Sequence, residues 1–146
     1  MGKHNYFELS EFINSATAKK KGIDNTPPFE VVDRLNELVD KFLDPLRAAY
    51  GMPIRITSGY RCPELNKAVG GSPTSAHLTG DASDITSQDT AEKLFEFTRQ
   101  WLEKTGVKFD QLILEENKKT GARWVHIGRI NKSGQQRGQI KKLSVE

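Results

Sequence analysis

The stretch between Phe29 and Ala49 constrains the fold of this chain most, because its apolar residues recur at steps of three and four. The stripe consists of Val32, Leu35, Leu38, Val39, Phe42 and Leu46. Such spacing places these side chains on one face of an α-helix, which has to be buried against another layer. Pro27 and Pro28 suit the first turn of this helix, and Gly51 suits its end. The sequence therefore predicts a long helix that packs along one side.

Other stretches predict shorter helices and a group of strands. Amphipathic patterning predicts helices over residues 6–22, 63–69 and 87–106. Alternating residues predict strands over 53–58 and 81–85, and a hairpin of strands 109–115 and 123–130 joined by the polar turn 116–122. We therefore expect an α+β fold, in which two long amphipathic helices pack on a small, mostly antiparallel sheet. The basic tail from about residue 130 is expected to be loosely ordered, with room for one late strand.

Length and cysteine content limit the class of protein. A chain of 146 residues corresponds to one domain, here residues 1–146, that can bury its own core. Cys62 is the only cysteine, so no internal disulfide is expected. No stretch approaches the ~20 apolar residues of a membrane span, and the N-terminus lacks the apolar core of a secretion signal. We therefore expect synthesis in the cytoplasm, with release to the outside by some other route.

The charge of the chain is mildly positive. A net charge of +3 and a pI of about 9.0 favour anionic partners without naming one. A nucleic-acid-binding surface would show basic residues interleaved with aromatic ones, and the sequence has no such stripe. We therefore expect no nucleic-acid partner.

The segment SAHLTGDASDI, residues 75–85, concentrates groups that suit chemistry better than a core. It holds His77 and Asp84, and a second histidine, His126, lies in a later strand. Two imidazoles and one carboxylate are a sufficient protein ligand set for a catalytic zinc ion, which keeps its fourth position open for water. Gly80 allows the chain to turn sharply between the two early ligands. The spacing alone is weak evidence, because histidine and aspartate are common residues.

Three motifs give the chain a resemblance to a known family. They are SAHLTGDASDI, which fits S-x-H-x-x-G-x-A-x-D, the later WVHI, which fits W-x-H, and SGYRCPELN. Over about residues 29–128 the chain resembles the zinc D-Ala-D-Ala carboxypeptidases and L-alanyl-D-glutamate endopeptidases, especially short phage or prophage members. Their fold is shared with vancomycin-resistance dipeptidases and the hedgehog signalling domain. The resemblance implies Zn²⁺ held by His77, Asp84 and His126, and cleavage of peptidoglycan stem peptides.

The resemblance also implies roles for residues near these ligands. Asp81 would have no ligand role. Arg61 matches the family arginine that binds a substrate carboxylate, which a guanidinium holds by two parallel hydrogen bonds. Ser75 matches a family serine that hydrogen-bonds the substrate. Without the resemblance, an arginine at position 61 is more often a surface-stacking or ion-pair residue, and a serine at position 75 is more often a local cap.

The general base is the point at which the sequence departs from the family pattern. In the carboxypeptidases and dipeptidases an Asp or Glu stands three residues before the last His, and here that residue is Arg123. If Ile113 faces His126 across the predicted hairpin, Glu115 lies on the same face, one diagonal away. A register slip of one residue would place Glu116 there instead. We take Glu115 as the base and Glu116 as the alternative.

The sequence thus predicts a monomeric zinc peptidase that uses metal-activated water to cut stem peptides. It leaves open whether the enzyme is a carboxypeptidase, which needs a free terminal carboxylate, or an endopeptidase, which needs an open groove. A catalytically degenerate module that binds zinc or peptide is the alternative function, and Arg123 supports it. The lack of a secretion signal fits a phage or prophage lysis enzyme that acts on the cell wall once it is released.

Overall fold

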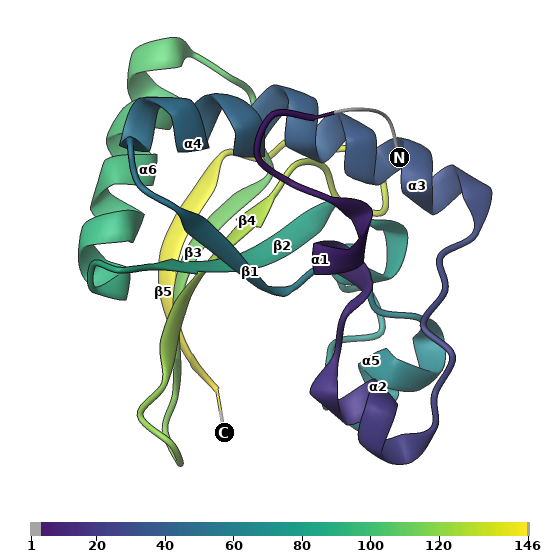
Figure 1. Cartoon of the computed structure of the whole chain (residues 1–146). Coiled ribbons are helices and arrows are strands. Elements are labelled where there is room, and N and C mark those ends of the chain that lie inside the picture. Colours follow the sequence, from purple (N-terminus) through teal and green to yellow (C-terminus); the bar gives the residue numbers. More distant parts are fainter. Residues whose placement is uncertain (1–3, 146) are drawn as a thin grey trace.

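The computed structural model, which describes residues 4–145, has helices packed on a five-stranded sheet (Figure 1). The helices are α1 (Leu9–Ile13), α2 (Ala16–Lys21), α3 (Phe29–Leu38), α4 (Asp44–Tyr50), α5 (Pro63–Ala68) and α6 (Ala91–Thr105), with a π-helical turn η1 (Val39–Leu43) and a 3-10 turn η2 (Ala76–Thr79). The strands are β1 (Ile54–Ser58), β2 (Ala82–Ser87), β3 (Gln111–Asn117), β4 (Arg123–Gly128) and β5 (Gln139–Val145), in the order β1-β2-β4-β3-β5. Only the β3–β5 pair is parallel. The expected α+β fold with a mostly antiparallel sheet is confirmed.

The predicted long helix is present as three consecutive parts, α3, η1 and α4. The wider turn η1 comes just before Pro45, which has no N–H to donate to a helical hydrogen bond. Five of the predicted stripe residues are buried: Leu35, Leu38, Val39, Phe42 and Leu46. The sixth prediction was wrong by one position, because Val31 is buried and Val32 is only half-buried.

The two ends of the chain differ from the prediction in detail. The single helix expected over residues 6–22 is interrupted, because Asn14 is extended and the Ser15 hydroxyl accepts a hydrogen bond from the Ala18 N–H to cap α2. The basic tail contains the one late strand for which the sequence left room. This strand is β5, which forms an edge of the sheet beside β3.

The central strands present one apolar and one polar face, because successive side chains of a strand point to opposite sides. Four core residues lie on the apolar face, which packs against α3, η1, α4 and α6: Ile85, Leu112, Val125 and Ile127. The alternating positions on these strands include Asp84, Glu115 and His126. Burial of the apolar face therefore fixes the register that brings the polar residues together.

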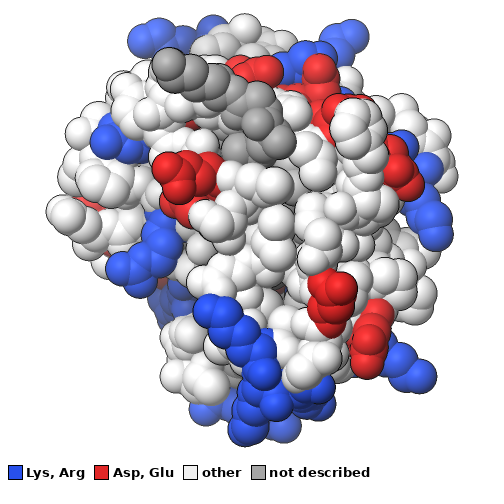
Figure 2. All heavy atoms as spheres, turned by 45° about the vertical axis from the view of Figure 1, so that its right-hand side comes forward, with Lys and Arg blue, Asp and Glu red and all other residues white. Residues whose placement is uncertain are grey.

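Charged side chains are unevenly spread over the surface. Lys19, Lys20 and Lys21 occupy the last turn of α2, and Lys and Arg side chains gather at the lower end of the face shown in Figure 2. Above them both signs are mixed, so this face has no continuous basic stripe. Within residues 4–145, no helix combines the length and the apolar character needed to cross a membrane.

Candidate active site

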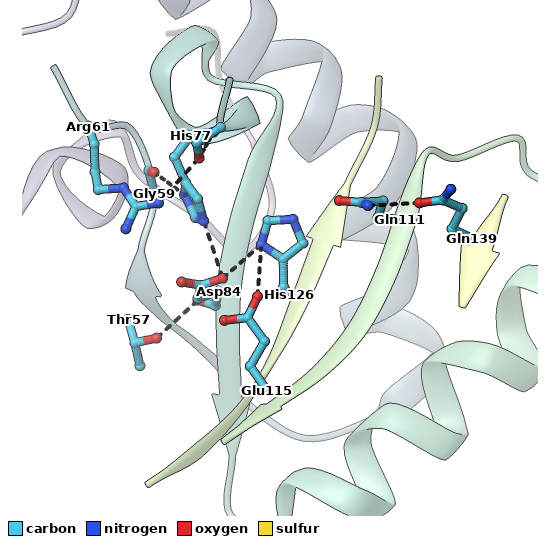
Figure 3. A network of polar contacts seen from close by, with 10 residues as sticks. Thr57, Gly59, Arg61, His77, Asp84, Gln111, Glu115, His126 and Gln139 are labelled. Atoms are coloured by element: carbon cyan, nitrogen blue, oxygen red, sulfur yellow. Dashed lines mark hydrogen bonds and ion pairs between the residues drawn. The ribbon is translucent and has the colours of Figure 1, made fainter. Parts of the chain in front are cut away.

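Three elements bring His77, Asp84 and His126 together on the polar face of the sheet (Figure 3). Asp84 of β2 and His126 of β4 are direct partners in the antiparallel ladder, and His77 comes from η2. Asp84 Oδ1 lies 3.3 Å from His77 Nε2 and 3.1 Å from His126 Nδ1. All three residues are buried, and one potential ligand atom from each lies within 4.8 Å of the others. The predicted ligands are thus close enough to share one ion.

The ring of His77 is oriented by a backbone carbonyl. His77 Nδ1 lies 2.7 Å from Gly59 O, which makes Nδ1 the protonated nitrogen and leaves a lone pair on Nε2. That lone pair faces the Asp84 carboxylate, and two acceptors in contact are satisfied by a cation between them. Metal-binding histidines commonly donate their other N–H in this way. The set of two imidazole nitrogens and one carboxylate oxygen therefore fits zinc.

Gly59 is a functional residue that the sequence reasoning missed. A Cβ atom at this position would lie 2.6 Å from the backbone of Phe12, so only glycine lets the two segments approach this closely. The approach is held by a hydrogen bond of 2.7 Å from Tyr60 N–H to Phe12 O. The available signal was the glycine itself, two residues before Arg61 in the motif SGYRCPELN.

The protonation states of Asp84 and His77 suit metal binding. Burial on its own would raise the pKa of Asp84, but the two neighbouring histidines hold that pKa well below its usual range. Burial lowers the pKa of His77, which keeps its ring neutral. Burial would also lower the pKa of His126, but the hydrogen bond and charge of Asp84 raise it overall. The cluster therefore offers an ionised carboxylate and a neutral imidazole to a cation.

Glu115 lies beside this cluster, at the position expected from the hairpin. Ile113 pairs with His126 and Glu115 pairs with Trp124, which is the register predicted from the sequence. Glu115 Oε1 is 3.9 Å from His126 Nδ1, and the side chain is 16% exposed. Burial and the negative charge of Asp84 raise the pKa of Glu115.

Glu116 and Arg123 are engaged elsewhere. Arg123 Nε lies 2.7 Å from Glu116 Oε2, and Arg123 Nη1 lies 2.8 Å from Glu92 Oε1 on α6. Glu116 is adjacent to Glu115 on β3, so its side chain points to the opposite side of the strand. The arginine that replaces the family acid is thus neutralised by two glutamates away from the metal ligands.

Arg61 and Ser75 lie next to His77, and they contact each other. Arg61 Nη2 donates to Ser75 Oγ over 3.3 Å, and the same hydroxyl accepts from the His77 N–H. Ser75 therefore caps the turn η2, which is the structural role that its position predicted. Arg61 Nε is buried and has no hydrogen-bond partner among residues 4–145. Burial lowers the pKa of Arg61, although an arginine stays charged at any working pH.

A polar cavity of about 390 Å³ adjoins Arg61. Its walls come from residues 14–17, from Thr57 and Ser58 of β1, and from Leu65 of α5. Arg61 is the one charged residue among those that line it. The cavity therefore suits a small polar ligand that carries a negative charge.

Comparison with known families agrees with this geometry. Residues 5–127 match the family model described as Peptidase M15. The chain belongs to the peptidase M15 family. This membership confirms the resemblance carried by SAHLTGDASDI, WVHI and SGYRCPELN, and it makes the chain a metallopeptidase, that is, a hydrolase. M15 peptidases are typically zinc-dependent, in accord with the His-Asp-His group. No curated protein matches this M15 chain.

Proposed function

We propose that this M15 peptidase cleaves peptidoglycan stem peptides with Zn²⁺ held by His77, Asp84 and His126. The observation that carries the proposal is the position of Glu115, whose carboxylate lies 3.9 Å from His126 Nδ1 at the edge of a three-residue ligand set. Three protein ligands leave one zinc position open for water, which is typical of catalytic sites. A carboxylate beside that position is what proton transfer requires.

The residues of the chain divide the chemistry between them. Zinc in this site would act as a Lewis acid and lower the pKa of a water molecule to about 7. The Glu115 carboxylate is placed to take a proton from the water that attacks the scissile carbonyl carbon, and to deliver it to the amine nitrogen as the C–N bond breaks. The raised pKa of Glu115 suits both steps, because a catalytic acid–base group works best near the operating pH. Gly59 O keeps the His77 ring in the tautomer that the site requires.

Arg61 selects the end of the substrate that enters the site. Its guanidinium is the charged group at the polar cavity, and it would hold a substrate carboxylate by parallel hydrogen bonds. Ser75 positions this guanidinium through the contact between its Oγ and Arg61 Nη2. Stem peptides carry free carboxylates, so this recognition fits either a carboxypeptidase or an endopeptidase of the cell wall.

The neighbouring glutamates allow a matched test. Purified protein is assayed for bound zinc and for digestion of muropeptides, together with Glu115→Gln and Glu116→Gln. We expect Glu115→Gln to keep its zinc and lose activity by about 10²–10⁴-fold, the usual contribution of an acid–base group. Glu116→Gln should stay close to wild type, because Glu116 pairs with Arg123 outside the site. Fragment masses would identify the bond that is cut.

Three results would contradict the proposal. If the wild type binds zinc but releases no fragment, the chain is a catalytically degenerate binding module, in line with Arg123 at the position of the family acid. If the wild type binds no zinc, the ligand assignment itself is wrong. Equal losses in Glu115→Gln and Glu116→Gln would reject Glu115 as the base.

A further inference from the structure

We infer that His4, Asp40 and Asp44 form a second cation site, built from none of the proposed active-site residues. One potential ligand atom from each of the three lies within 4.8 Å of the other two. His4 belongs to the N-terminal segment, which crosses the helix formed by α3, η1 and α4 in Figure 1. Asp40 lies in η1 and Asp44 begins α4. The site would take a divalent transition-metal ion.

The hydrogen bonding of His4 leaves its buried Nδ1 atom without a hydrogen-bond partner among residues 4–145. The side chain of His4 is only 3% exposed. Its Nε2 lies 2.8 Å from Asn36 Oδ1, so Nε2 carries the proton and Nδ1 has the lone pair in the neutral ring. Asp40 Oδ1 lies 2.9 Å from Nδ1, yet Nδ1 makes no hydrogen bond to any of residues 4–145. A lone pair and a carboxylate oxygen thus face each other without a proton in line between them.

Asp44 adds a second carboxylate with an unsatisfied oxygen. Asp44 Oδ2 accepts a hydrogen bond from the Asn5 N–H and lies 3.8 Å from His4 Nδ1. Its Oδ1 is buried and has no hydrogen-bond partner within residues 4–145. Lys41, the cation next to Asp40 in sequence, instead lies 2.8 Å from Glu37 Oε2. The buried His4 ring nitrogen, the buried Asp44 carboxylate and the exposed Asp40 carboxylate therefore converge, and none of the described residues 4–145 places a lysine in an ion pair with them.

The arrangement around His4 repeats that around His77. In both, one ring nitrogen donates to an amide or peptide oxygen, Asn36 Oδ1 or Gly59 O, and the other faces a carboxylate. This is the usual support for a metal-binding histidine. One imidazole and two carboxylates suit a transition-metal dication such as Zn²⁺ or Mn²⁺. The ion would fasten the N-terminal segment to the helix and stabilise the folded chain.

Zinc stoichiometry tests the second site independently of catalysis. The untagged full chain carrying Asp84→Asn, which removes an active-site ligand, is stripped with a chelator and equilibrated with Zn²⁺ alone. We expect the addition of His4→Gln to remove one equivalent of bound zinc. Asp40→Asn, at a side chain 63% exposed, should have the same effect without threatening the fold. Glu37→Gln on the same helix is the matched control and should retain the equivalent.

Two further readouts make the result specific. Zinc should shift the ¹⁵N resonance of His4 Nδ1, and it should raise the melting temperature less in Asp40→Asn than in Glu37→Gln. Equal zinc contents with and without His4→Gln and Asp40→Asn would overturn the second site. Failure of the proposed active site would instead appear as equal zinc contents with and without Asp84→Asn, so the two failures are distinguishable.

Discussion

Asp81 and Asp84 belong to one short segment and are both buried, with exposures of 1% and 8%, yet their partners differ. The Asp81 carboxylate accepts hydrogen bonds from Arg129 (2.8 Å), Arg34 (3.2 Å) and Thr79 (2.7 Å). These donors satisfy both carboxylate oxygens with groups that never lose their protons. Asp81 is therefore a structural anchor between α3, η2 and the end of β4.

Asp84 instead faces two imidazoles, those of His77 and His126. A neutral imidazole offers a lone pair as readily as a proton, so this carboxylate is surrounded by groups that can share a cation with it. The difference teaches that a buried carboxylate among arginines is already compensated by fixed charges, whereas one among histidines can share a cation with them. Substitutions at the two positions should separate these roles.

The largest expected effect is the loss of activity in Asp84→Asn. Removing a ligand should weaken zinc binding and cost several kcal/mol of transition-state stabilisation, which is a fall in kcat/KM of more than about 10³-fold. Asp81→Asn should keep its zinc and most of its activity in the folded fraction. Zinc content and muropeptide digestion measure both variants. If Asp81→Asn also loses its zinc, the division of roles fails.

The second-largest expected effect is a loss of stability in Asp81→Asn. Asp81→Asn removes the charge that compensates Arg129, whose side chain is 15% exposed, so we expect a loss of about 3 kcal/mol in the free energy of unfolding. Urea denaturation of the metal-free proteins measures this value. Asp84→Asn should cost the metal-free protein less, because its histidines can lose their protons. A larger loss for Asp84→Asn would reverse the comparison.

His77, Asp84 and His126 were predicted from the family motifs, whereas Glu115 was predicted from strand alternation in the hairpin. Asp84 and His126 face each other because the apolar residues of β2 and β4 must point into the core. Glu115 follows from the same rule on β3, since Leu112 of that strand is in the core. Once the motifs name the ligands, strand alternation is sufficient to place Glu115 beside them.

Contacts between distant segments could not be predicted in this way. Arg34 and Arg129 reach Asp81 across 47 and 48 residues of chain, and Gly59 supports His77 through a close approach to Phe12. The fold shows the same limit. Helical periodicity predicts the helix from Phe29, but whether Val31 or Val32 is the buried side chain depends on how the whole helix packs.

The two arginines around Asp81 should contribute unequally. Arg129→Met removes the shorter and more buried hydrogen bond to the charged carboxylate, so we expect a loss of about 2 kcal/mol in unfolding free energy. Arg34→Met should cost less than about 1 kcal/mol, because the Arg34 side chain is 47% exposed and its ion pair is weakened by solvent. Denaturation of both variants in parallel gives the ratio. Equal losses would mean that Asp81 depends on total charge and not on burial.

The smallest expected effect is a change in the pKa of the His126 ring. Asp84 raises the pKa of His126 in the metal-free protein, against the effect of burial. Asp84→Asn should therefore lower that pKa in an NMR titration of the His126 ring, and Asp81→Asn should leave it unchanged. Because the pKa of His126 is raised in the folded protein, this ring contributes its full stability below the unfolded pKa of about 6.5. That stability is lost as the pH rises through the folded pKa.

Ring titration is the right measurement, because global unfolding would mix two opposite contributions. Burial lowers the pKa of His77, so its contribution to stability is present above the unfolded value of about 6.5 and is lost as the pH falls from there through the lower folded pKa. The two histidines thus oppose each other in a denaturation curve, although each responds to Asp84. A His126 pKa that did not respond to Asp84→Asn would show that the carboxylate and the ring are not coupled, and the contrast with Asp81 would lose its electrostatic basis.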